Sequence, residues 1–221
     1  MHNIFFEGVT WDFFAVGFSQ VPGGEIYQNR SVLSYHYYEP PDFSKTLNFA
    51  ARMEDLERLK CGGFLTEMYT VGKDFESMHK MFDLCDKHKQ SWHGWMYKPY
   101  GCIEQHLACD NTTNHSGGPG EIVVQNTSRT YPQAVAGNIE SYSFDKDTNE
   151  FHLSYHVNAD CQSTTTEVYF NKAMHYPNGF DYTLSPKDHV KMSISDNGFL
   201  INLVHDSLNA GDKITFSLSP K

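Results

Sequence analysis

The chain has 221 residues, of which 39% are hydrophobic and 14% aromatic, and its formal net charge at pH 7 is -10. This length allows one large domain or two small ones with a substantial core. A surface that binds nucleic-acid phosphates needs an excess of basic residues, so the acidic balance argues against a nucleic-acid partner. No run of about 18 apolar residues occurs, so no transmembrane helix is expected.

The chain begins with two segments whose composition is typical of strands. Residues 3–10 are rich in Phe and predict a buried strand with Glu7 near its end. Residues 31–38 are β-branched and aromatic and predict a second strand, which Glu39 and two prolines stop. Because side chains alternate along a strand, His36 and Tyr38 are expected on the same side.

Helical and extended patterns then alternate. Apolar residues recur at helical spacing over residues 43–60, where Asp42 or Ser44 can cap the start and Gly62 ends the helix. A short apolar strand follows and leads to Glu67. Residues 74–88 predict a second helix and residues 91–98 a further strand. Strands and helices in this alternation indicate an α/β fold built from parallel βαβ units.

The helical pattern disappears in the second part of the chain. Short β-branched or alternating runs, punctuated by turn residues, predict an antiparallel β-sandwich. These runs are residues 139–144, 150–157, 165–170, 179–184, 190–195, 199–205 and 213–218. We therefore expect two domains, residues 1–133 and 134–221, with the boundary near Ala134.

The ends of three consecutive predicted strands carry residues suited to chemistry on sugars. His36 and Tyr38 end one strand, Glu67 ends the next, and Trp92 and Trp95 lie on the third. In a (β/α) barrel the catalytic groups sit at the carboxyl ends of the strands. A retaining glycosidase needs an ionised carboxylate near the anomeric carbon, a hydroxyl that holds it and an aromatic face for the sugar ring. Taken singly, these residues are also compatible with a salt-bridged glutamate, a core histidine and packing aromatics.

With these motifs in order, the sequence resembles the endoglycoceramidases, a branch of glycoside hydrolase family 5 that cuts the bond between oligosaccharide and ceramide in glycosphingolipids. The resemblance spans nearly the whole chain. It rests on FFEGVTW (residues 5–11), VGFSQVPGG (16–24), SYHYY (34–38), FLTE (64–67), WMYK (95–98) and RTYPQAVAG (129–137).

The resemblance implies a fold and a set of roles. The first domain would be the carboxy-terminal half, strands five to eight, of a (β/α)8 TIM barrel, followed by the small β-sandwich domain. Glu67 matches the catalytic nucleophile, and His36 and Tyr38 match the family's His-x-Tyr, whose tyrosine hydroxyl is expected to donate to the nucleophile. Trp95, with Trp92 as the alternative, matches the tryptophan that binds substrate. Glu7 is a weaker substrate-binding candidate.

One expected residue is absent. The family carries its general acid/base glutamate in an Asn-Glu-Pro motif, and no Asn-Glu-Pro occurs among the 221 residues. We therefore expect this chain to be the carboxy-terminal part of a longer enzyme, to be inactive alone and to follow a signal peptide encoded upstream. Two alternatives stay open: a β-glucosidase acting on glucosylceramide or steryl glucoside, and a non-catalytic glycolipid-binding fragment.

Sequons and cysteines suggest a compartment. Asn-x-Ser/Thr sequons occur at Asn29, Asn111, Asn114 and Asn126, which favours a secreted protein or one in a lysosomal or digestive lumen. Cys102 with Cys109 is the preferred disulfide, Cys61 with Cys85 a possible one, and Cys161 would be left over.

The resemblance also implies the partners. The substrate would be a ganglioside or neutral glycosylceramide at a membrane or micelle surface, with no cofactor. An activator protein that presents the lipid is a further candidate partner. An alternative zinc site would use Cys102, His106, Cys109 and His115, but their spacing fits no common zinc pattern.

Overall fold

The computed structural model describes residues 2–8, 17–39, 44–69, 75–95 and 121–221. They form two compact units, Met1–Thr127 and Ser128–Lys221. The units divide slightly before the boundary expected near Ala134. The reason is a strand that the sequence patterns did not predict, β5 (Tyr131–Ala134), which pairs with β8 (Thr165–Tyr169) and so belongs to the second unit.

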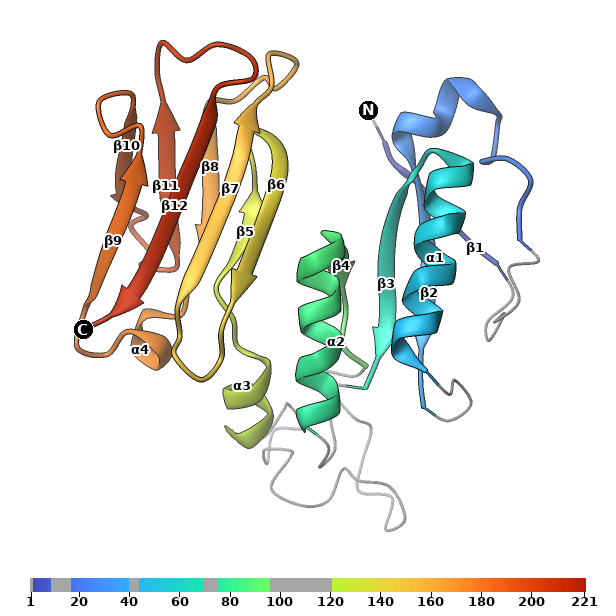
Figure 1. The fold of residues 1–221 in the computed structure, drawn as a ribbon, viewed down its shortest axis with the longest axis horizontal. Helices are drawn as coiled ribbons and strands as arrows, with labels where there is room; N and C mark the ends of the chain where they lie inside the picture. The colour runs from blue at the N-terminus through green and yellow to red at the C-terminus, as the bar shows by residue number, and fades with distance from the viewer. Residues whose placement is uncertain (1, 9–16, 40–43, 70–74, 96–120) are drawn as a thin grey trace. The chain divides into compact units, whose positions relative to one another are not determined.

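The first unit contains a parallel sheet in the order β1-β2-β3-β4. The strands are β1 (Ile4–Glu7), β2 (Ser31–Tyr37), β3 (Gly62–Met68) and β4 (Ser91–Trp92), and the 3-10 helix η1 (Glu25–Arg30) precedes β2. Helices α1 (Lys45–Leu59) and α2 (Phe75–His88) connect successive strands, which confirms the expected βαβ units (Figure 1). A further helix, α3 (Glu121–Thr127), was not predicted.

The start of helix α1 confirms the expected cap at Ser44, but Lys60 rather than Gly62 ends the helix. The Ser44 side chain accepts a hydrogen bond from the Leu47 amide, and Lys60 ends the helix in the left-handed conformation with φ 53°. Three positions of its apolar spacing lie in the core: Leu59 is 2% exposed, and Met53 and Leu56 pack against buried clusters. Leu47, which shares the helical apolar spacing, is instead 54% exposed, and Phe49 is 1% exposed. Phe49 packs edge-on against Tyr35 of β2, with ring centroids 6.1 Å apart.

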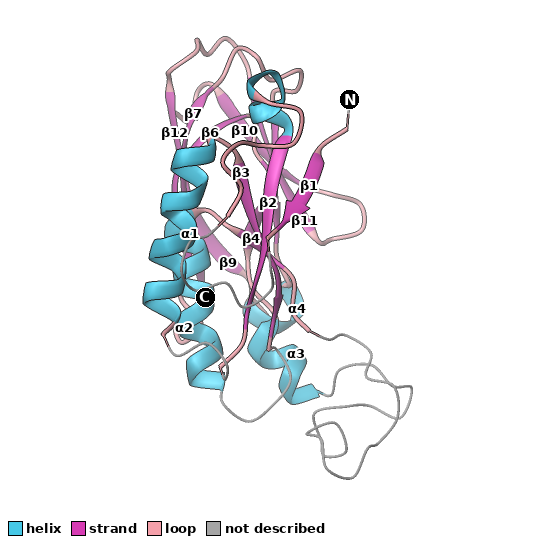
Figure 2. Cartoon of the chain, turned by 90° about the vertical axis from the view of Figure 1, so that its right-hand side faces the viewer, coloured by secondary structure: helices cyan, strands magenta, loops and turns pink. Residues whose placement is uncertain are grey.

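Both helices cover one face of the parallel sheet (Figure 2). Tyr35 and Leu65 of the sheet share a buried cluster with Phe49 of α1 and Phe82 and Cys85 of α2. Burial of aromatic and aliphatic side chains of this size contributes roughly 1.5–3 kcal/mol each, so this cluster is the main source of stability for the βαβ units.

Two adjacent glycines at the start of β3 give a matched test of this packing. A Cβ on Gly63 would lie 2.3 Å from Gln90 Oε1 and 2.4 Å from a Leu56 methyl, whereas a Cβ on Gly62 would meet nothing closer than 3.7 Å. Gln90 is itself fixed, because it accepts a hydrogen bond from the Tyr35 hydroxyl. We expect Gly63→Ala to lower the free energy of unfolding by about 1–3 kcal/mol through overpacking, and Gly62→Ala to leave it within about 0.5 kcal/mol. Equal effects in urea titrations of the two variants would contradict this account of the packing.

The second unit is a sandwich of two four-stranded sheets, in the orders β10-β11-β8-β5 and β6-β7-β12-β9 (Figure 1). All pairs in it are antiparallel. The remaining strands, each confirming a predicted run, are β6 (Gly137–Phe144), β7 (Phe151–Val157), β9 (Phe180–Ser185), β10 (Val190–Ile194), β11 (Leu200–His205) and β12 (Lys213–Pro220). Inward side chains of both sheets, such as Val168 and Ile201 opposite Tyr155 and Phe216, fill one core.

A short helix, α4 (Lys172–His175), places a buried histidine at one end of the sandwich. His175 is 6% exposed. Its Nδ1 lies 2.8 Å from Asn149 Oδ1, and its Nε2 lies 3.1 Å from Ser128 Oγ. Burial lowers the pKa of His175; the contact with Ser128 opposes this shift, and the positive charge of Arg129 adds to it.

This histidine predicts a pH dependence of stability. Since the folded state lowers the pKa of His175, the unfolded chain binds the proton first as the pH falls below about 6.5. The second unit should therefore lose stability on acidification through that range, and His175→Gln should remove part of the loss. Hydrogen exchange of β7 and β12 amides between pH 7.5 and 5 measures this dependence. Identical pH slopes for the two proteins would refute it.

The cysteines depart from one expectation. Cys61 and Cys85 are both free, so the possible disulfide between them does not form. Cys61 packs against the cluster of Phe6 and Leu33, whereas Cys85 lies in the buried cluster beneath α1 and α2. Cys161 is also free. Residues 102 and 109 lie outside the described residues.

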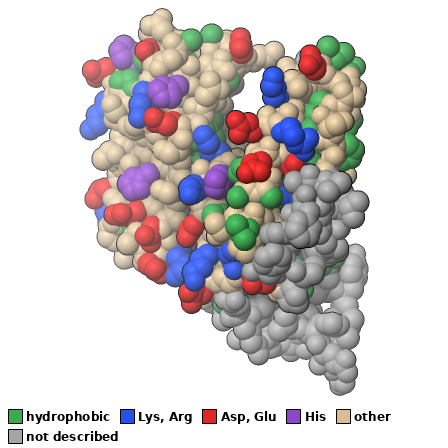
Figure 3. Space-filling model, turned by 45° about the vertical axis from the view of Figure 1, so that its right-hand side comes forward, with side chains coloured by type: hydrophobic (Ala, Val, Ile, Leu, Met, Phe, Trp, Pro, Cys, Tyr) green, Lys and Arg blue, Asp and Glu red, His purple; other side chains and the backbone are tan. Residues whose placement is uncertain are grey.

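Figure 3 shows acidic, basic and histidine side chains on the face in view, so charges of both signs lie on this face. Among the described residues, no helix is both long and apolar enough to cross a membrane.

Candidate active site

The parallel sheet has two chemically different faces. Tyr35 and Tyr37 of β2 point into the cluster beneath the helices. The residues between and after them, His36 and Tyr38, therefore lie on the opposite face, as the alternation along the strand predicts. His36 makes its contacts there, with Glu7 and Glu67.

A β-bulge determines where Glu67 points. The register of β2 with β3 pairs Tyr35 with Leu65 but His36 with Glu67, so Thr66 is the extra residue. Without it, alternation would put Glu67 on the same face as Leu65, beneath the helices. The Thr66 hydroxyl donates to the Tyr35 carbonyl over 3.3 Å and holds the bulge. Bulges re-aim side chains in this way next to functional sites.

Glu67 is held by two neighbours through a single oxygen. The Tyr38 hydroxyl donates to Glu67 Oε2 over 2.9 Å, and His36 Nδ1 lies 3.4 Å from the same oxygen. On the other side of the imidazole, Nε2 lies 3.3 Å from Glu7 Oε1. The structure thus brings together Glu7, His36, Tyr38 and Glu67, all at or next to strand ends.

Tyr38 is suited to act as a permanent donor. Its side chain is buried, at 8% exposure. Burial, and after it the hydrogen bond and the charge of Glu67, raise the pKa of Tyr38 far above its ordinary value. The hydroxyl therefore stays protonated and orients the carboxylate of Glu67. Both contacts are made through Oε2, so Glu67 Oε1 has no partner among the described residues.

The two tryptophans lie in different places. Trp92 pairs with Leu65 across the sheet, and paired residues share a face, so Trp92 points toward the helices and stacks on Phe82 with ring centroids 4.4 Å apart. The structure does not bring it to the carboxylates. Trp95 is 48% exposed, and its amide donates to the Met68 carbonyl over 2.7 Å. Of these two tryptophans, Trp95 is therefore the exposed one.

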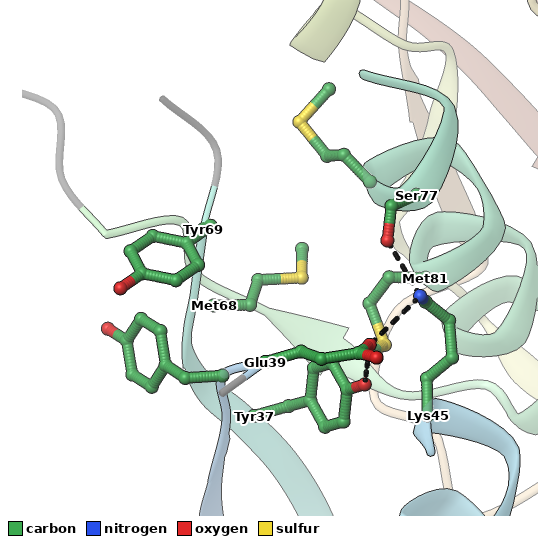
Figure 4. A pocket seen from close by; sticks show the side chains of 9 residues that line it. Tyr37, Glu39, Lys45, Met68, Tyr69, Ser77 and Met81 are labelled. Atoms are coloured by element: carbon green, nitrogen blue, oxygen red, sulfur yellow. Dashed lines mark hydrogen bonds and ion pairs between the residues drawn. The ribbon is translucent and has the colours of Figure 1, made fainter. Parts of the chain in front are cut away.

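A pocket of about 130 Å³ adjoins Tyr38. It lies at the ends of β2 and β3, next to α1 and α2, and Tyr69 and Met68 line it (Figure 4). At its far side Glu39 accepts from the Tyr37 hydroxyl, over 2.7 Å, and contacts Lys45.

The sequence patterns missed Tyr69. Its ring packs edge-on against Tyr38 with centroids 4.7 Å apart, and it is 52% exposed. Its position two residues beyond Glu67, where an alternating side chain returns to the same face, was the available signal.

Metal ligation finds no support in the described part of the chain. No group of three or more His, Cys, Asp and Glu side chains there could hold a metal ion. The residues of the alternative zinc site, Cys102, His106, Cys109 and His115, lie outside the described residues.

Comparison with known proteins relates this geometry to a family. The chain is 62% identical over 219 residues to an endoglycoceramidase of Hydra vulgaris and 59% identical over 225 residues to one of Cyanea nozakii. The chain is thus similar in sequence to endoglycoceramidases. Residues 129–217 match the glycoside hydrolase family 5 C-terminal domain, as expected for the carboxy-terminal part of such an enzyme.

The match covers only part of those endoglycoceramidases. These alignments take in 99% and 100% of this chain but 42% and 44% of the relatives, so the chain spans less than half of their length.

Solved structures support the fold. The endo-glycoceramidase II of Rhodococcus sp., in a complex with cellobiose-like isofagomine, superimposes with a TM-score of 0.72 at 15% identity, covering 99% of this chain and 49% of that one. The sterylglucosidase 1 of Cryptococcus neoformans gives a TM-score of 0.62, also at 15% identity, covering 87% of this chain and 37% of that one. These likenesses concern the fold of both units, not their chemistry.

Proposed function

We propose that this chain forms the nucleophile-bearing half of a retaining glycoside hydrolase that cleaves the β-glycosidic bond between oligosaccharide and ceramide in glycosphingolipids. The observation that carries the proposal is Glu67, aimed by a bulge away from the helices and held through Oε2 by Tyr38. Identity of 62% to an endoglycoceramidase supports the substrate class. The parallel strands correspond, in this proposal, to strands five to eight of a (β/α)8 barrel.

The geometry suits a double displacement. Glu67 Oε1 attacks the anomeric carbon of the ceramide-linked sugar, while Tyr38 and His36 stay on Oε2 and keep the carboxylate oriented. The ceramide oxygen leaves with a proton, and water then releases the sugar with its configuration retained. Trp95, exposed beyond the end of β4, offers an aromatic face to the sugar ring.

The proton for the leaving group needs a second carboxyl. No Asn-Glu-Pro is found among these 221 residues, so we assign the acid/base glutamate to a segment outside them. In a retaining enzyme its carboxyl would lie about 5–5.5 Å from that of Glu67. The chain alone should therefore show no turnover.

A chimera tests the proposal. Residues 1–221 replace the matching segment of the Hydra vulgaris endoglycoceramidase, which supplies the remaining segments, and the 221-residue chain alone is the control. With a ganglioside or a neutral glycosylceramide in detergent micelles, the chimera should release an intact oligosaccharide and ceramide. Release of monosaccharide alone, or hydrolysis of steryl glucoside in its place, would establish the β-glucosidase alternative, whose fold is also similar. Binding of glycolipid without turnover by the chimera would favour the non-catalytic alternative.

A lipid substrate implies where the enzyme acts. We place the enzyme at a membrane or micelle surface, in the secreted space or in a lysosomal or digestive lumen. An activator protein that presents the lipid is its proposed partner. Asn29, in η1, is an exposed sequon asparagine, which suits glycosylation there. The need for an activator is tested by comparing hydrolysis rates on lipid vesicles with those on detergent micelles. The compartment is tested by treating the protein with an enzyme that removes N-glycans and measuring the loss of mass.

A further inference from the structure

Three ionisable side chains form a row across three neighbouring strands. Glu7 ends β1, His36 lies near the end of β2, and Glu67 lies near the end of β3. The imidazole is in the middle, with Nε2 3.3 Å from Glu7 Oε1 and Nδ1 3.4 Å from Glu67 Oε2. Glu7 thus reaches the Glu67 carboxylate only through the ring of His36.

An imidazole is a rigid plane, so its two nitrogens move together. Rotation of a histidine ring about its last side-chain torsion is broad and roughly two-fold, and this torsion is not set by the backbone. A contact at Nε2 therefore also sets the direction in which Nδ1 points. The β2 backbone places His36 on the face that carries Glu7 and Glu67, and one ring orientation makes both contacts.

Burial supports the same arrangement. A carboxylate oxygen only accepts hydrogen bonds, so a ring nitrogen that carries a hydrogen can donate to the carboxylate it faces. The His36 side chain is 16% exposed, against 34% for Glu7 and 29% for Glu67, so water screens the histidine least.

We propose that Glu7 is a positioning residue for the reaction: its carboxylate holds the His36 ring at Nε2 and thereby aims Nδ1 at the Glu67 oxygen that Tyr38 also holds. This inference rests on the proposed function. It replaces a substrate-binding role for Glu7, because Glu7 Oε1 is engaged by the histidine. The two roles differ in their kinetics, since loss of a substrate contact raises KM, whereas misplacement of the nucleophile lowers kcat.

The test uses the chimera with Glu7→Ala, Glu7→Gln and the control Glu76→Gln, whose side chain is 82% exposed on α2. Glu7→Ala should lower kcat by about 10–100-fold, as small displacements of reacting groups do, with KM within about twofold. Glu7→Gln keeps an oxygen acceptor for Nε2 and should recover much of the loss. A rise in KM at constant kcat, or unchanged values for both, would overturn the proposal.

A crystal structure of the Glu7→Ala chimera separates this inference from the proposed function. The His36 ring should turn so that Nδ1 no longer contacts Glu67, and Glu7→Gln should keep the contact. If the chimera proves inactive but the His36 ring turns in Glu7→Ala and keeps its contact in Glu7→Gln, the proposed function fails and the positioning contact stands. If the ring keeps its place in Glu7→Ala, the positioning role fails whatever the activity.

Discussion

Glu67→Gln is expected to lower the kcat of the chimera by ~10³-fold or more, which corresponds to about 4 kcal/mol in the activation barrier. Glutamine has nearly the same shape and can still accept from the Tyr38 hydroxyl, but its amide oxygen is a poor nucleophile. The site is partly exposed, so the thermal unfolding temperature should change little. Initial rates of ceramide release measure the effect, with Glu76→Gln as the control for loss of a carboxylate.

Azide rescue distinguishes a nucleophile from an acid/base residue. In Glu67→Ala, azide can enter the vacated space and attack the anomeric carbon directly, which gives a glycosyl azide of inverted configuration. If Glu67 were instead the acid/base group, the covalent intermediate would still form, and azide would give the retained anomer. A retained product, or activity near that of the parent in Glu67→Gln, would contradict the assignment.

Phe82→Ala is expected to have the largest effect on the stability of the first unit, about 3–5 kcal/mol. Phe82 is 0% exposed and stacks on Trp92 at 4.4 Å and 22°. Its removal leaves a cavity between α2 and the sheet. All three tryptophans, Trp11, Trp92 and Trp95, precede residue 128, so fluorescence in a urea titration reports the first unit.

Phe5→Ala is the matched control for this change. Phe5 belongs to the same unit but is 53% exposed, on the face away from the helices, where its ring lies 5.9 Å from that of Phe64. Its loss should lower the free energy of unfolding by less than about 1 kcal/mol, because this exposed side chain buries little apolar surface on folding. Similar urea midpoints for the two variants would show that the buried cluster between the helices and the sheet, which contains Phe82, is not the main core of the unit.

Local pattern was sufficient for much of this protein. The βαβ units, the antiparallel runs of the second unit and the shared side of His36 and Tyr38 follow from periodicity and turn residues, which act within a few positions. The acidic charge likewise depends on composition alone. The candidate residues Glu67, His36 and Tyr38 were accessible because a strand end and its alternation are local properties.

Long-range pairing decided the rest. Strand β5 is short and contains a proline, and only its partner β8 makes it a strand. Regular alternation assigns Glu67 and Leu65 to one face; the bulge at Thr66, which arises from the register between β2 and β3, separates them. Trp92 is buried by a helix, and Glu7 meets His36 across a sheet. Such contacts join residues far apart in the chain, so the sequence determined which groups this site contains, whereas the tertiary structure decided which of them face one another.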